Sequence, residues 1–252
     1  MRILITNDDG ILAPGLLALR RAMAEMGEIT VVAPVTPQSA VGHGITLNDP
    51  IRVHRVDLGG GQAGHGVEGS PADCVKLALL ELLPVRPDLI VSGVNLGANV
   101  GINVLYSGTV AAAVEGAFYG VPSAAISVED SDNADYDGAA RIGRTIIRQW
   151  LAKNHARPLL LNINVPDLGR GPPAGVKVAP QSMKGYAEGW ERRADPRGRT
   201  YYWMTGSQSR EDAGVDSDVA AFEQRYVTVT PLQFDLTDHA RLEEMRGWNL
   251  NS

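Results

Sequence analysis

The chain has 252 residues, of which 44% are hydrophobic and 21% charged, which is typical of a globular protein and excludes extensive disorder. The formal net charge of −6 offers no attraction to an extended polyanion or an acidic membrane surface, so we expect neither nucleic-acid polymers nor membranes as partners. Cys74 is the single cysteine and cannot form an internal disulfide. Because there is also no leader-like segment and no apolar run of about 18 residues, we expect a cytoplasmic protein.

The first elements of the chain predict a strand, a charged loop and a helix. The apolar run 3–5 is followed directly by Asp8, Asp9 and Gly10, and an apolar-periodic segment covers residues 16–26. A buried parallel strand that ends in carboxylates places them at the carboxyl edge of a sheet. Open α/β folds bind ligands at that edge.

The same alternation continues to residue 166 and predicts an α/β core with a parallel sheet. Ser70 is the predicted cap of a helix that runs to Leu83, with Pro71 at its first position and Asp73 in its first turn. We expect further strands at 29–33, 51–56 (an edge strand), 89–93, 124–128 and 159–164, and further helices at 110–119 and 137–152.

The composition shifts to Gly, Pro, Arg, Trp and Tyr after residue 166. Alternating runs at 175–179, 199–205 and 226–230 predict hairpins, which are marginal alone and favour packing on a neighbouring subunit. A last short helix is expected to have Thr237 as its cap and to end near Met245. We therefore divide the chain into a core (1–166) and a C-terminal extension with an oligomerisation arm (167–252).

Polar residues follow three of the predicted strands directly. They are Asp8 and Asp9, Ser39, and Asn95. Parallel strands bring these three loops to one edge of the sheet, and a set of oxygen ligands suits Mg²⁺ or Mn²⁺. The alternative is that the acidic pair belongs to a loop that caps a helix, because adjacent carboxylates are common on surfaces.

Ser107, Gly108 and Thr109 precede the small-residue helix at 110–119. They form either an ordinary helix cap or, beside a metal, a phosphate cradle, because the free N–H groups of a helix N-terminus bind anions.

His43 lies between two glycines and has two open roles, an acid for a leaving group or a structural residue. Cys74 is expected to pack in the core. The motifs of P-loop, serine-hydrolase and dinucleotide-binding proteins are absent.

Six stretches of the sequence together carry a resemblance to a known family. They are residues 3–10, 33–39, 69–75, 92–99, 106–113 and 231–237. Through them the chain resembles the SurE family, the stationary-phase survival proteins that are metal-dependent 5′/3′-nucleotidases, over nearly its whole length.

This resemblance implies a fold and a set of functional residues. The fold is a Rossmann-like three-layer αβα sandwich with a mostly parallel sheet and a C-terminal arm swapped between subunits of a homodimer or homotetramer. The family's metal ligands correspond to Asp8, Asp9, Ser39 and Asn95, which would hold one divalent ion per subunit. Its phosphate-binding residues correspond to Ser107, Gly108 and Thr109, joined by Asn95, and we assign catalysis to Asp8, Asp9 and Asn95.

The function expected from this site is metal-dependent hydrolysis of nucleoside 5′-monophosphates, and of 3′-monophosphates or short polyphosphate as further substrates. Direct attack by water and an aspartyl phosphate on Asp8 are both open routes. A sugar phosphate is a further substrate class within the same chemistry. The alternative from another class is a nucleotide-binding or phosphate-binding regulator without turnover. The adjacent carboxylates oppose that alternative, since they repel phosphate unless a metal lies between them.

Overall fold

The computed structural model describes residues 1–153, 160–183, 186–208, 216–248 and 250. Its centre is a nine-stranded sheet in the order β3-β4-β2-β1-β5-β6-β7-β11-β8, in which only the pairs β3–β4 and β7–β11 are antiparallel. The strands are β1 (Arg2–Thr6), β2 (Glu28–Pro34), β3 (Val53–Gly59), β4 (Gln62–Val67), β5 (Leu89–Leu96), β6 (Ser123–Val128), β7 (Leu160–Val165), β8 (Gly175–Val178) and β11 (Tyr226–Leu232). The predicted α/β class with a mostly parallel sheet is confirmed.

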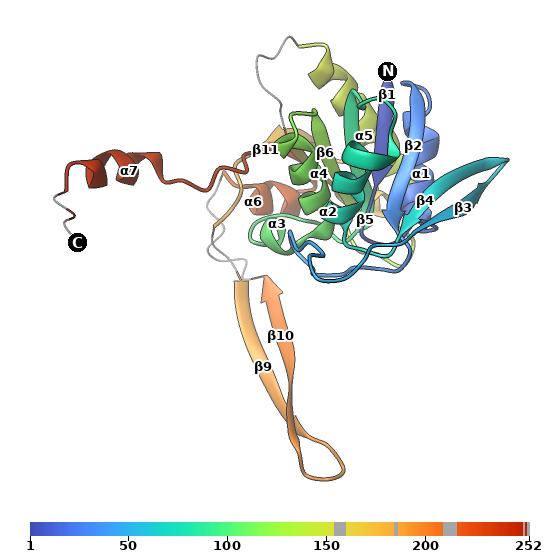
Figure 1. Ribbon diagram of the computed structural model, residues 1–252. Helices are drawn as coiled ribbons and strands as arrows, with labels where there is room; N and C mark the ends of the chain where they lie inside the picture. Colours follow the sequence, from blue (N-terminus) through green and yellow to red (C-terminus); the bar gives the residue numbers. More distant parts are fainter. Residues whose placement is uncertain (154–159, 184–185, 209–215, 249, 251–252) are drawn as a thin grey trace.

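Helices cover both faces of this sheet and make the three layers of an αβα sandwich (Figure 1). The helical segments are α1 (Pro14–Met23), α2 (Pro71–Leu77), η1 (Ala78–Leu82), α3 (Asn103–Tyr106), α4 (Gly108–Phe118), α5 (Tyr136–Leu151), η2 (Leu168–Arg170), α6 (Asp218–Glu223) and α7 (His239–Arg246). None of the helices in the described ranges is long and apolar enough to cross a bilayer.

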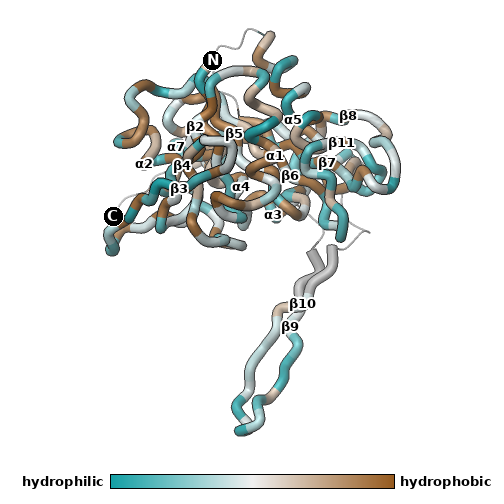
Figure 2. Tube along the Cα trace, turned by 90° about the vertical axis from the view of Figure 1, so that its right-hand side faces the viewer, coloured by the Kyte–Doolittle hydropathy of each residue, from teal (hydrophilic) through white to brown (hydrophobic). Residues whose placement is uncertain are grey.

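Strand β1 shows why the sheet needs a helical layer on each side. Its residues Ile3, Leu4 and Ile5 are all buried, although successive side chains of a strand point to opposite faces. Ile3 and Ile5 pack in the cluster that contains α1 and α5, whereas Leu4 packs in the cluster with α2 and α4. The apolar segments accordingly lie inside the sandwich in Figure 2. A continuous apolar run is therefore the expected sequence of this central parallel strand.

The order of the strands creates a switch point beside β1. From β1 the chain moves to β2 and then to β4 on one side, and it returns to β5 on the other side. The loops that leave β1 and β5 therefore diverge at the carboxyl edge of the sheet. A crevice at such a point is the usual ligand site of an open α/β sheet.

Several predicted elements have different bounds in the structure. Strand β4 was not predicted, because its sequence QAGHGV lacks an apolar run. The helix expected to reach Leu83 ends as α2 at Leu77 and continues as a π-helical segment. The cap of the last helix is Asp238 rather than Thr237, since the Asp238 side chain accepts a hydrogen bond from the backbone of Arg241. Residue 159 of the expected strand at 159–164 lies outside the described residues.

The described residues of the C-terminal region form one separate hairpin, whereas several were predicted. Strands β9 (Tyr186–Ala194) and β10 (Thr200–Gln208) pair with each other and project from the sandwich (Figure 1). The other two alternating runs form β8 and β11 of the central sheet. Strand β11 pairs with the buried strand β7 on one side and with β8 on the other, so both strands extend the sheet. The sheet thus continues beyond residue 166, and the division into two domains there stays a prediction.

Asp218 fastens this C-terminal region to the loop that follows β5. Its buried carboxylate accepts hydrogen bonds from the backbone N–H groups of Gly101 (2.9 Å), Ser182 (2.8 Å) and Val219 (2.8 Å). Burial raises the pKa of Asp218, and these backbone hydrogen bonds partly offset that rise. The interaction holds three separate segments at one point.

We predict that Asp218→Ala lowers the free energy of unfolding by about 2–4 kcal/mol, because it leaves buried N–H groups without an acceptor. Asp216→Ala is the matched control, since Asp216 is exposed and forms an ion pair with Lys177 at 3.1 Å. We expect that control to change stability by no more than about 0.5 kcal/mol in urea denaturation. Equal stability of the two variants would contradict the role of Asp218.

Candidate active site

Asp8 lies at the carboxyl end of β1 and is bonded to the N-terminus of α4. Its Oδ1 accepts a short hydrogen bond from the hydroxyl of Thr109, and the backbone of Thr109 also donates to the carboxylate. A Cβ built on Gly108 would lie 2.9 Å from the Cβ of Asp8, so a larger residue there would push the helix away. The first turn of α4 and the end of β1 are therefore in direct contact.

Asp8 and Asp9 are carboxylates in an environment that opposes their charge. Burial raises the pKa of Asp8 to about 6, the Thr109 hydroxyl lowers it in part, and the neighbouring charge of Asp9 raises it further. Burial also raises the pKa of Asp9, and a hydrogen bond from the backbone of Leu96 offsets part of that rise. Neither carboxylate has a Lys, Arg or His partner among the ion pairs of the described residues. Among the described residues, no positively charged side chain therefore forms an ion pair with Asp8 or Asp9.

Asn95 lies on β5, the strand beside β1, and its side chain is largely buried. Its Nδ2 donates to the carbonyl oxygen of Gly97 at 2.6 Å, which turns the amide nitrogen toward the loop. In the part of the chain that the structure describes, no hydrogen bond reaches its Oδ1. That oxygen is the one available to a ligand.

The loop that carries Ser39 is held by several hydrogen bonds, of which two bound the segment 38–46. The backbone N–H of Gln38 donates to the carbonyl oxygen of Asp8 at 2.8 Å. Farther along, the hydroxyl and the backbone N–H of Thr46 donate to the carboxylate of Asp73 at 2.7 and 3.0 Å. Ser39 is exposed and directly follows the first of these anchors. The loop therefore begins at the backbone of Asp8 and continues along the edge of the site.

The predicted cap at Ser107 is confirmed, since its hydroxyl accepts a hydrogen bond from the backbone of Val110 at 3.1 Å. Asp73 likewise forms a capping box with Ser70, with bonds of 2.9 and 3.1 Å. Cys74 is buried in the core, where desolvation raises the pKa of its thiol well above the ordinary value. The prediction that Cys74 packs in the core is confirmed.

His43 belongs to a chain of polar contacts that the sequence did not predict. Its Nε2 lies 2.7 Å from Oε2 of Glu115, and Nζ of Lys76 lies 3.3 Å from the other carboxylate oxygen. Burial raises the pKa of Glu115, but the hydrogen bond from His43 and the charge of Lys76 outweigh that effect and lower it overall. One available signal was Glu115 itself, a lone charged residue within the apolar helix α4.

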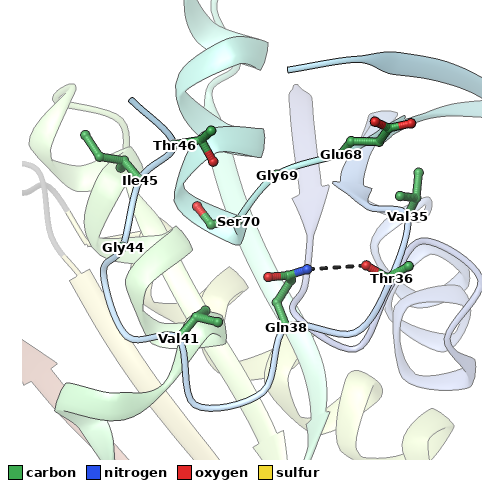
Figure 3. A pocket seen from close by; sticks show the side chains of 10 residues that line it. All are labelled: Val35, Thr36, Gln38, Val41, Gly44, Ile45, Thr46, Glu68, Gly69 and Ser70. Carbon is green, nitrogen blue, oxygen red and sulfur yellow. Dashed lines mark hydrogen bonds between the residues drawn. The ribbon is translucent and has the colours of Figure 1, made fainter. Parts of the chain in front are cut away.

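Two cavities adjoin the loop that carries Ser39 and His43. The first has a volume of about 610 Å³ and lies between the segments 35–46 and 68–70 (Figure 3). In that view the side chain of Gln38 reaches toward Thr36, to which it is hydrogen-bonded at 3.3 Å. The second cavity, of about 620 Å³, includes His43 and Ser107. Both are large enough for a small molecule.

The doubly wound sheet and the acidic pair at its switch point define a Rossmann-like α/β protein with a candidate ligand site at the carboxyl edge. Residues 3–188 match the family model described as Survival protein SurE, and the chain belongs to this family. It is 49% identical to the 5′-nucleotidase SurE of Rhodopirellula baltica over 99% of both chains. The identity to the 5′-nucleotidase SurE of Heliobacterium modesticaldum is 47%, over 98% of this chain and 92% of the relative.

The fold is also similar to a crystal structure of the SurE protein from Aquifex aeolicus. The TM-score is 0.85 at 35% sequence identity, and the match covers 98% of each chain. The resemblance drawn from the six sequence stretches is thus confirmed at the level of family and fold.

We predict that Asp8 stabilises the metal-free protein less as the pH rises from 4 to 7. The folded-state pKa of Asp8 lies above its ordinary value of 3.8, at about 6, so the folded protein retains a proton that the unfolded chain releases. The stability lost is about 3 kcal/mol at most. Asp8→Asn should remove this contribution of Asp8 to the pH dependence and stabilise the protein at pH 7 in chelator, since the amide oxygen of the new side chain can still accept a hydrogen bond. Equal unfolding free energies of Asp8→Asn and the parent protein at pH 7 in chelator would contradict this prediction.

Proposed function

We propose that this chain is a divalent-metal-dependent phosphomonoesterase that hydrolyses nucleoside 5′-monophosphates to nucleoside and phosphate. The observation that carries the proposal is the uncompensated pair Asp8 and Asp9 beside the N-terminus of α4. A cation between the carboxylates and a phosphate dianion would offset the negative charge of both groups. The names of the relatives, 5′-nucleotidase SurE, are in keeping with this chemistry.

The metal would be held by oxygen atoms of Asp8, Asp9, Ser39 and Asn95. No group of three or more His, Cys, Asp or Glu side chains among the described residues is arranged to bind an ion, and the proposed site takes Ser39 and Asn95 as its further ligands. Carboxylate, amide and hydroxyl oxygens suit a hard cation, and we propose one Mg²⁺ or Mn²⁺ per chain. Bound there, the ion would polarise a phosphoryl oxygen and lower the pKa of a water molecule.

The residues of the chain would position and stabilise the phosphoryl group. The hydroxyl of Ser107 and the backbone N–H of Gly108 lie at the N-terminus of α4, which favours negative charge, and we assign them to phosphate oxygens. Thr109 donates to Asp8, so we assign it the orientation of that carboxylate as well as a place in the phosphate site. Asn95 contributes its Oδ1 to the metal and lies beside the reacting group. Asp8, Asp9 and Asn95 are thus the proposed catalytic residues.

Nucleoside 3′-monophosphates and short polyphosphate are further proposed substrates, since the phosphate site itself recognises only the phosphoryl group. A regulator that binds nucleotide without turnover is the competing function. Release of inorganic phosphate from AMP separates the two, because a regulator would bind AMP and release none.

We predict that purified protein releases phosphate from AMP with Mn²⁺ or Mg²⁺ and loses this activity in excess chelator. Asp9→Asn should lower kcat/KM at least about a hundredfold, because an anionic ligand is lost. Added metal should partly restore the activity of the variant. The measurement is phosphate release over a series of metal concentrations.

Asp57→Asn is the matched control for this experiment. Asp57 lies on the exposed edge strand β3 and accepts a hydrogen bond from Gly59 at 2.9 Å, which asparagine can also accept. The control should keep full activity. Full activity of Asp9→Asn, or activity that survives the chelator, would overturn the metal-dependent function.

We also propose that the chain acts in the cytoplasm as a homodimer or homotetramer with a swapped C-terminal arm. The hairpin β9–β10 stands apart from the sandwich and exposes large side chains (Figure 1). Helix α7 extends away and has no buried residue. An exposed aromatic hairpin of two strands and an unburied helix both favour packing on another copy of the chain. The exposed residues of the hairpin include Trp190, Tyr201, Tyr202, Trp203 and Met204.

We predict that Trp203→Glu weakens the oligomer, because it places a charge in the proposed contact. The dissociation constant should rise about tenfold or more in sedimentation velocity. Leu80→Glu is the control, since Leu80 on η1 and Trp203 are both 58% exposed. A parent chain that sediments as a monomer, or a variant that assembles like its parent, would contradict the proposed contact.

A further inference from the structure

The second cavity adjoins the proposed phosphate site and is mainly apolar. Ser107, the cap of α4, lines it, and one side of α4 forms a wall through Val110, Val114 and Phe118. The segment that follows β11 also lines the cavity, and the ring of Phe234 lies edge to face with that of Phe118, with 5.8 Å between the ring centroids. A ligand with its phosphate at Ser107 would therefore extend an apolar part into this cavity.

The ring of His43 is one of the polar groups that line the cavity, together with Lys76, Gln181 and Gln233. The carboxylate of Glu115 can only accept a hydrogen bond, so Nε2 of His43 carries the proton in that contact. In the neutral ring, Nδ1 is then an acceptor. It has no hydrogen bond to any described residue, and the His43 side chain is 41% exposed. The ion pair of Glu115 with Lys76 holds the carboxylate in place and so fixes the ring.

We propose that this cavity binds the nucleoside part of the substrate and that His43 is its specificity-determining residue. The inference rests on the proposed phosphomonoesterase function, which supplies the position of the phosphate. Nδ1 of His43 accepts a hydrogen bond from a ribose hydroxyl or an amino group of the base, and the apolar walls contact the base.

The cavity around Gln38 is less suited to this ligand. The hydroxyl of Ser70 accepts a bond from Asp73, the side chain of Gln38 bonds to Thr36, and Ser107 is not among its lining residues (Figure 3). Polyphosphate and simple sugar phosphates have no apolar part to place against Phe118 and Phe234. The second cavity therefore favours nucleoside monophosphates over those substrates.

The first test fills the cavity. Val114→Trp puts a large side chain on its wall, and Val85→Trp is the matched control at the opposite edge of the sheet, beside Arg2 and Glu28. The readout is the ratio of kcat/KM for AMP to kcat/KM for glycerol phosphate, which carries no base. We expect Val114→Trp to lower this ratio about tenfold or more and Val85→Trp to leave it unchanged. Phe118→Ala, at an exposed position, is a second variant that should lower the ratio if Val114→Trp does not fold.

The outcomes separate this inference from the proposed function. Hydrolysis of both substrates with an unchanged ratio in Val114→Trp and Phe118→Ala would overturn the nucleoside cavity and leave the phosphomonoesterase intact. Absence of hydrolysis of any monoester would overturn the proposed function instead. Adenosine binding, measured by saturation-transfer NMR, then tests the cavity without turnover. A change in oligomeric state of Phe118→Ala without loss of adenosine binding would assign the cavity to contact with a second copy and overturn the inference.

The second test addresses His43. His43→Ala should raise KM for AMP about tenfold with little change in kcat, and His43→Gln should restore part of the affinity. His54→Ala is a close control, because Nε2 of His54 also lies 2.7 Å from a glutamate, Glu68, on the exposed edge of the sheet. If His43→Ala instead lowers kcat and removes a limb of the pH profile, His43 is the acid for the leaving group and its role in recognition is overturned.

Discussion

The parallel pairing of β1 between β2 and β5 is the constraint on which the candidate site depends. Ile5 is paired with Val31 and Thr6 with Ser92, so the three strands end at the same edge of the sheet. The chain leaves β1 toward β2 and reaches β5 only after crossing back, which separates the two loops and leaves room between them. Asp8, Ser39 and Asn95 come from these three exits. Although these residues are far apart in the sequence, the pairing of β1 with both neighbours brings their loops to the same edge of the sheet.

The buried aspartates of this fold differ in the partners of their carboxylates. Asp218 receives three backbone N–H bonds, and Asp73 is satisfied by its capping box and by Thr46, so both hold segments of the chain together. Asp8 is also buried but has Thr109 as its side-chain partner and a second carboxylate beside it. Such an unbalanced charge lowers stability in the absence of a ligand. Two carboxylates without a positive partner are expected at a site where a bound cation stabilises the folded protein.

The loop between β2 and β3 connects this charged centre to the cavities on either side. Its first anchor is the backbone of Asp8, its last is Asp73 at the start of α2, and between them His43 is bonded to Glu115 on α4. The loop is therefore attached to the elements that would hold metal and phosphate. A ligand that moves this loop would act on Ser39 and His43 together. In the proposed function, this short segment would couple recognition of the phosphate to recognition of the rest of the substrate.

The sequence by itself determined the α/β class, the exit of the first strand at Asp8 and Asp9, and the helix cap at Ser70, because apolar runs and capping residues are local signals. It left Ser107 open between a cap and a phosphate cradle, and it ended the strand at 89–93 before Asn95, which lies within β5. Only the tertiary structure decided that β8 and β11 extend the central sheet, since pairing with β7 depends on a surface made by distant residues. It also decided the partners of Glu115 and the hydrogen bond from Thr109 to Asp8. Those contacts join residues that are 72 and 101 positions apart, and no local pattern encodes such a distance.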